Sequence, residues 1–230
     1  LFGAPGMGKT RMLDAIAHHF KRVDKPPRTI TISCREAPDE PYEPIPKILQ
    51  ERFELEPGLD DITKRIAVTR FVGSVFGGEK SKWVTEASHL LGHLARIPFP
   101  QSPVLRSLEA DPQRLQLRIH LSLQRFIEAD AASGGILWII DDLHLASPEA
   151  LLLIADLVDS LDHIPFVLLA SGLPSLQSTL KVDESERFVL DPLSDESMRE
   201  IFPLLLPGLQ SAPVELVDAA VERASGNPTS

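Results

Sequence analysis

Hydrophobic residues along the chain follow two spacings, one typical of buried strands and the other of amphipathic helices. Strands of a buried sheet are predicted by four apolar or β-branched runs, at 29–34, 136–140, 165–171 and 187–190. Between these runs apolar residues recur at helical spacing, and Asp111 and Ser147 each stand as a cap before a proline at a predicted helix start. Because strands that alternate with helices form parallel sheets, the pattern predicts an α/β fold with helices on both faces of the sheet.

Two regions of the chain depart from this alternation. Between about residues 45 and 110 only helical patterns occur, which predicts a helical insertion broken by prolines at 98, 100 and 103. After residue 190 two further helices are predicted, one capped by Ser194 and one between Pro213 and Gly226. We therefore expect one α/β domain over residues 1–190 and the start of a small helical lid over 191–230.

A glycine-rich motif opens the chain, directly before the first predicted helix. Residues 3–10, GAPGMGKT, match the phosphate-binding pattern G-x-x-x-x-G-K-[ST] at every fixed position. The glycines let successive N–H groups point into one concavity at a helix N-terminus, where anions bind. Lys9 is expected to contact the β- and γ-phosphates, and Thr10 to hold Mg²⁺. The alternative is a glycine-rich turn that precedes a helix by chance.

The motif predicts which residues bind a nucleotide. They are Gly3, Ala4, Pro5, Gly6, Met7, Gly8, Lys9, Thr10 and Arg11. Guanine specificity would need an Asn/Thr-Lys-x-Asp element, which this sequence does not contain, but the motif by itself leaves the base preference open. A loop of this kind follows a buried strand, and only Leu1 and Phe2 precede Gly3, so we expect that the first strand has been cut nearly to its end.

Two aspartates follow the apolar run 136–140. Ligands in open α/β sheets bind at the carboxyl ends of the strands, so Asp141 is expected to hold Mg²⁺ opposite Thr10. Asp142 is then a candidate catalytic base that polarises a water molecule for attack on the γ-phosphate, together with Lys9 as the catalytic cation. The alternatives are a helix cap or loop carboxylate for Asp141, and for Asp142 an acid that only tunes the local field.

Other polar residues give weaker signals. Ser171 ends the next apolar run, where it could either contact the γ-phosphate or simply be the polar residue at which the strand leaves the core. His89 and His93 have the i, i+4 spacing of a metal-binding pair, but no third ligand accompanies them, which favours a solvated helix face. Cys34 has no identifiable partner base, so it is expected to be a core residue.

Composition and charge exclude several classes of protein. The 230 residues are 43% hydrophobic and 24% charged, as in a soluble globular protein. The net charge of −10 argues against a broad nucleic-acid-binding surface, and no apolar run is long enough to cross a membrane. A single cysteine cannot form an internal disulfide, which fits the reducing cytoplasm.

Taken together, these motifs resemble the AAA-type ATPase domain of STAND regulators, the signal-transduction P-loop ATPases of large bacterial transcription regulators and kinase-linked multidomain proteins. The residues that carry the resemblance are the phosphate loop, Tyr42-Glu43-Pro44, the run 136–144, the strand that ends in residues 170–174, Asp191-Pro192-Leu193-Ser194 and Ser225-Gly226-Asn227-Pro228. The resemblance implies a five-stranded P-loop NTPase sheet and a lid. It also implies that Pro228 lies near the nucleotide.

The resemblance also implies how such a domain works. ATP and Mg²⁺ would be its cofactors, and nucleotide exchange would switch it between closed and open, oligomer-prone states, with other domains of the same polypeptide or a homo-oligomer as partners. Many relatives have an arginine after the sensor strand, where this chain has Gly172. We therefore expect a slow regulatory ATPase. A non-hydrolysing interaction module and, with less support, a DNA-linked loader or initiator ATPase are the alternatives.

Overall fold

A parallel three-stranded sheet forms the centre of the molecule. The computed structural model describes residues 1–36, 40–78, 82–108, 110–178, 180, 183–205 and 213–229. The strands are β1 (Arg28–Ser33), β2 (Ile136–Asp141) and β3 (Phe166–Ala170), in the spatial order β1-β2-β3. Their register pairs Ser33 with Asp141 and Ile140 with Ala170, so all three strands end at one edge.

The sheet continues beyond β3 as isolated bridges. Phe2 is bridged in parallel to Gly172 on one side and to Val189 on the other. The main-chain nitrogen of Phe2 donates to the oxygen of Phe188 at 2.7 Å, and Leu190 N donates back to Phe2 O at 2.8 Å. The predicted strand at 187–190 is thus present as a single parallel bridge at Val189, with Phe2 as its partner among the described residues, and not as a longer ladder.

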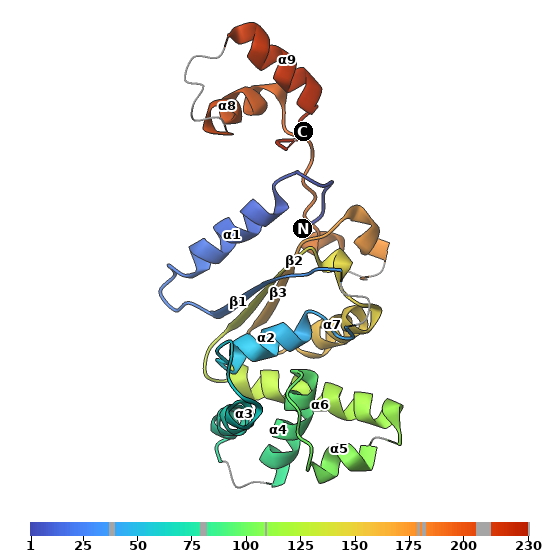
Figure 1. Ribbon diagram of the computed structural model, residues 1–230. Coiled ribbons are helices and arrows are strands. Elements are labelled where there is room, and N and C mark those ends of the chain that lie inside the picture. The colour runs from blue at the N-terminus through green and yellow to red at the C-terminus, as the bar shows by residue number, and fades with distance from the viewer. Residues whose placement is uncertain are drawn as a thin grey trace.

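Helices cover both faces of the sheet, as predicted. Helix α1 (Lys9–Phe20) packs Leu13 and Ala17 against Leu137 and Ile139 of β2. The alternate residues of β2 face the larger core on the opposite side, beneath α2 (Ile45–Arg52), α6 (Pro112–Ala131) and α7 (Pro148–Ser160). Figure 1 shows α1 on one side of the strands and α2 and α7 on the other. Because both faces are covered, every residue of β2 is buried.

Strand β3 is less buried than its apolar sequence predicts. Four of its five residues are half-buried and Val167 is 56% exposed. One edge of β3 pairs with β2. At the other edge, Leu1 N donates to Ala170 O at 2.7 Å, at the end of the strand. An apolar run indicates a strand, but its neighbours decide how far the strand is buried.

The helical insertion is part of the main core. It contains α2, α3 (Asp61–Val75), α4 (Lys82–Leu94) and α5 (Pro103–Leu108). Helix α5 was not predicted, because prolines there were interpreted as chain breakers. Ser102 accepts a hydrogen bond from Leu105 N at 3.1 Å, and Pro103 occupies the first helical position, where its missing N–H has no consequence.

Two helices, α8 (Asp195–Leu205) and α9 (Val214–Ala224), lie in the range predicted as a lid and pack on a separate small core of Met198, Val221 and Ala224. Residues 206–212 and 230 of the expected lid range lie outside the described residues. Short 3₁₀ turns complete the fold at Leu143–Leu145, Pro174–Ser178 and Glu184–Glu186. In the parts of the chain that the structure describes, no helix has the length and hydrophobicity needed to cross a membrane.

A buried carboxylate joins the insertion to the sheet. Asp130, 3% exposed, accepts from Arg52 through Nε at 2.7 Å and Nη2 at 2.6 Å. Arg28, the first residue of β1, places its Nη2 3.2 Å from the same carboxylate. The Arg52 guanidinium also lies over the ring of Phe71, 4.4 Å from its centroid. The cluster therefore ties α2, α3, α6 and β1 together.

We expect Asp130→Asn to lower the free energy of unfolding by about 2–4 kcal/mol, because it removes a buried negative charge that neutralises two arginines. This loss of stability is at the lower end of what breaking a buried ion pair costs, because both arginine guanidinium groups remain partly hydrated. Urea denaturation measures the change. Asp159→Asn, an exposed aspartate on α7, is the matched control. Equal stability of the two variants would contradict a stabilising role for the cluster.

Candidate functional site

The phosphate loop connects the end of the sheet to α1. Gly6 and Gly8 have φ angles of 82° and 83°, in the region that favours glycine, and α1 begins at the next residue, Lys9. No side chain caps the first turn of α1. Its N–H groups therefore remain directed to the concavity of the loop, an arrangement that suits an anion.

Lys9 is folded back onto its own loop. Its Nζ donates to the main-chain oxygens of Gly3 at 3.1 Å and Ala4 at 3.0 Å, and the residue is only 7% exposed. The ammonium group is thus held within the loop by two carbonyl oxygens. These bonds place the charge among the groups that would surround a phosphate.

Thr10, Asp141 and Ser171 form one hydrogen-bonded chain. Thr10 Oγ1 donates to Asp141 Oδ2 at 2.6 Å, across 131 residues of sequence. The other carboxylate oxygen of Asp141 accepts a short bond from Ser171 Oγ and a bond of 3.1 Å from Asp142 N. Asp141 is 7% exposed and Ser171 is 1% exposed. The hydroxyl of Ser171 therefore acts on Asp141, and would have to leave it to contact a nucleotide.

The donor set of Thr10 and Asp141 fits a magnesium ion. Mg²⁺ prefers oxygen ligands and keeps several waters, so it uses few protein groups. Because Thr10 donates its proton to Asp141, the lone pairs of its oxygen remain available to a cation. In the described residues no group of three or more histidine, cysteine or acidic side chains gathers as a metal site. Any cation here would therefore be completed by phosphate and water oxygens.

Asp142 lies beside this chain in a left-handed backbone conformation, with φ 54°. Its main-chain nitrogen donates to Ser171 Oγ at 3.0 Å, and its side chain remains 39% exposed. His144 Nδ1 is 3.9 Å from Asp142 Oδ1 and has no hydrogen-bond partner. The backbone of Asp142 is thus fixed, while its carboxylate is accessible.

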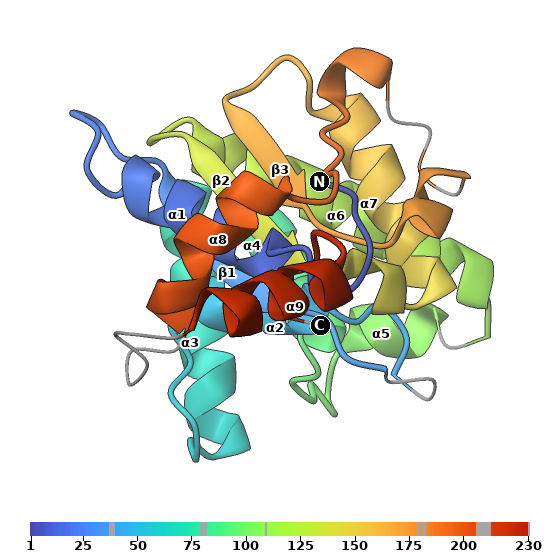
Figure 2. The same ribbon diagram turned by 90° about the horizontal axis from the view of Figure 1, so that it is seen from above.

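The lid reaches the phosphate loop through its last described residues. Asn227 Nδ2 donates to the main-chain oxygen of Pro5 at 3.0 Å. Pro228 follows and is half-buried. Figure 1 shows the carboxyl end of the chain between the lid helices and the loop that leads into α1, and Figure 2 shows the lid over the same edge from above. The end of α9 and the phosphate loop are thus in direct contact.

Other predicted or candidate residues lie elsewhere. Arg11 lies in the first turn of α1, where its side chain is exposed. Cys34 is buried, and burial together with the charge of Glu43 raises the pKa of its thiol to about 12, which suits a core residue. His89 donates to or accepts from Ser102 Oγ at 2.9 Å and does not pair with His93.

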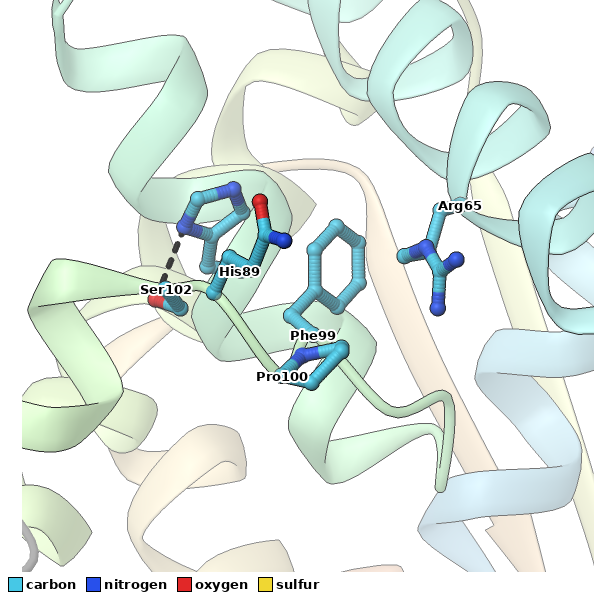
Figure 3. Close-up of a pocket in the computed structure, with 6 residues that line it drawn as sticks. Arg65, His89, Phe99, Pro100 and Ser102 are labelled. Atoms are coloured by element: carbon cyan, nitrogen blue, oxygen red, sulfur yellow. Dashed lines mark hydrogen bonds between the residues drawn. The ribbon is translucent and has the colours of Figure 1, made fainter.

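A hollow of about 270 Å³ lies on the helical insertion, away from the phosphate loop. Figure 3 shows His89, Phe99 and Ser102 on one side of it and Arg65 on the other. Its buried polar groups satisfy each other, and Arg65 Nη1 donates to Pro98 O at 3.0 Å. Burial lowers the pKa of His89, which keeps the ring neutral. Nothing in this hollow resembles a phosphate or metal site.

Two residues make contacts that the sequence does not indicate. Asn227 lies in the stretch Ser225-Gly226-Asn227-Pro228 that carries the family resemblance, but an amide three residues after the end of α9 gives no signal of its own for a contact with the phosphate loop. Glu43, 1% exposed, forms an ion pair with Lys47 and another of 3.3 Å with Arg96. It carries a buried charge on the loop between β1 and α2. Only its burial reveals it.

Comparison with known proteins agrees with this geometry. The family model described as the AAA ATPase domain matches residues 1–169, which include the phosphate loop, the helical insertion and both aspartates. No curated protein matches the chain. The family supports nucleotide-dependent ATPase activity with ATP as the ligand. The match covers most of the chain and includes both the phosphate loop and Asp141 at the end of β2. The protein therefore belongs to the AAA ATPase domain family.

Proposed function

We propose that this domain binds MgATP and hydrolyses it slowly, as a nucleotide-dependent switch in a larger cytoplasmic signalling or transcription-regulatory protein of the STAND class. The observation that carries the proposal is the hydrogen bond between Thr10 and Asp141, which joins the phosphate loop to the end of the central strand. Loop and strand end are the two halves of a P-loop nucleotide site. Their direct contact supports binding of a phosphate chain with its cation.

The residues take separate parts in the proposed reaction. The N–H groups of residues 6–10 would cradle the phosphates, and Lys9 would leave the carbonyls of Gly3 and Ala4 to neutralise them. Thr10 and Asp141 would hold Mg²⁺, which supplies charge stabilisation at the phosphate oxygens. Ser171 would fix the carboxylate of Asp141. Phosphoryl transfer depends mainly on this positioning and on positive charge.

Asp142 is the proposed base. Its carboxylate is accessible, whereas both oxygens of Asp141 accept hydrogen bonds. A base must be able to reach the proton it removes, so the exposed carboxylate suits the role better. Asp142 is therefore proposed to orient water and accept its proton.

Slow turnover follows from what the site contains. Ser171 is followed by Gly172, where many relatives have an arginine, so this position supplies no positive charge to the γ-phosphate. A catalytic arginine can increase the rate of phosphoryl transfer by about 10³–10⁵. A site without one keeps its nucleotide for long enough to act as a switch. Partner domains or an oligomer would supply the missing charge.

We expect Lys9→Ala to abolish MgATP binding in the full-length protein, because main-chain groups cannot replace the charge of the ammonium group on the phosphates. Isothermal titration calorimetry tests this. Lys21→Ala, an exposed lysine just after α1, is the control and should bind as the wild type does. Unchanged affinity in Lys9→Ala would refute the nucleotide site.

We expect the Asp142→Asn variant to bind MgATP normally. Its kcat should fall by a factor of about 10²–10⁴, because a carboxamide can hydrogen-bond water but is a poor proton acceptor. Asparagine also tolerates the left-handed backbone at this position, so the loop should keep its shape. Glu149→Gln, exposed in the first turn of α7, is the matched control. Normal turnover in Asp142→Asn would place the base elsewhere.

The monomeric protein should turn over on the order of once per minute or less, because no arginine finger can be assigned among the described residues. A steady-state phosphate-release assay measures this rate, and an activated assembly of the intact protein should be faster. Many turnovers per second without a partner would contradict a switch. Tight ATP binding without turnover in any assembly would favour the non-hydrolysing module.

A further inference from the structure

The amide of Asn227 is held in one orientation on the outer surface of the phosphate loop. Its Oδ1 accepts from the main-chain nitrogen and from Oγ1 of Thr229, both at 3.1 Å. Its Nδ2 donates to the main-chain oxygen of Pro5 at 3.0 Å. Since the oxygen is occupied by two donors within the lid, the NH₂ group is the end that faces the loop.

Gly6 gives the lid its access to the loop. A Cβ built on Gly6 would lie 2.0 Å from Thr229 Oγ1 and 2.4 Å from Asn227 Oδ1, far closer than atoms can approach. The φ angle of 82° at Gly6 is itself one that side chains rarely adopt. Two independent constraints therefore require glycine here, the conformation of the loop and the close approach of the lid.

Internal donors occupy three consecutive carbonyls of the loop. Lys9 Nζ donates to those of Gly3 and Ala4, and Asn227 Nδ2 donates to that of Pro5. When Lys9 moves to a phosphate, it must give up both of its carbonyls. Among the side chains that the structure describes, Asn227 is then the donor that remains on this stretch. It would then still hold the Pro5 carbonyl.

The lid holds Asn227 firmly enough to act in this way. Gly226 directly precedes Asn227 and packs closely against the segment that enters the lid, since a Cβ at this position would lie 2.6 Å from Leu193 O. Leu193 N donates to Gly226 O at 2.9 Å, which ties the end of α9 to the segment that enters the lid. The small core of Met198, Val221 and Ala224 lies behind this contact. Asn227 is therefore presented from a packed unit.

We infer that Asn227 is a positioning residue for the phosphate loop, by which the lid controls how fast nucleotide leaves. The inference rests on the proposed nucleotide-binding function and adds a regulatory contact to it. The lid acts on the loop directly through the Pro5 carbonyl, in addition to any contact made through the nucleotide. Opening of the lid removes this donor, and the loop loses part of the support that keeps its N–H groups on the phosphates.

Stopped-flow release of the fluorescent nucleotide mant-ADP, with Mg²⁺, tests this in the full-length protein. Asn227→Ala should raise the release rate about 3- to 10-fold, the effect of one lost hydrogen bond, with little change in the association rate. Asn227→Asp keeps the shape and the acceptor for Thr229 but replaces the donor by a negative charge next to a carbonyl. It should therefore release at least as fast as Asn227→Ala.

The control is Glu222→Ala, an exposed side chain on α9 that makes no contact with the loop, and its release rate should match the wild type. If Asn227→Ala fails to fold, Asn227→Asp decides the question, because it is isosteric. Wild-type release rates in both Asn227 variants would overturn this inference and leave the nucleotide site intact. Absence of mant-ADP binding by the wild type would overturn both.

Discussion

The hydrogen bond between Thr10 and Asp141 is the contact on which the site depends. It joins the first turn of α1 to the end of the central strand, and Asp141 can make it because β2 is buried on both faces and fixed in register. Ser171 and the main chain of Asp142 hold the opposite oxygen of the same carboxylate. A displacement of any of the three strands would therefore disturb the proposed cation site.

The molecule divides into two packed units that meet at this site. The sheet and the helical insertion share one large core, whereas the lid has a small core of its own. Between them, Asn227 donates to Pro5 across the loop. A small unit joined through few polar contacts opens at a lower free energy than a shared core does. This difference suits a lid that moves while the sheet stays fixed.

Local signals predicted most elements, and the failures have a common cause. Asp111 and Ser147 accept hydrogen bonds at the starts of α6 and α7, as their sequence positions predict. Helix α5 was missed because Ser102 and Pro103 form a start signal within a proline-rich stretch. The segment at 187–190 has a strand-like composition but only one bridging partner. Residue composition is a property of one segment, whereas strand pairing depends on which other segments lie beside it.

The sequence by itself determined the fold class, the phosphate loop and the two aspartates, because each depends on residue types at fixed spacing in one stretch of chain. Only the tertiary structure decided which contacts these residues make. It directed Ser171 to Asp141, left the carboxylate of Asp142 accessible, and brought Asn227 to Pro5 from 222 residues away. Contacts at such separations depend on how the packed elements are arranged, and no local pattern encodes that arrangement.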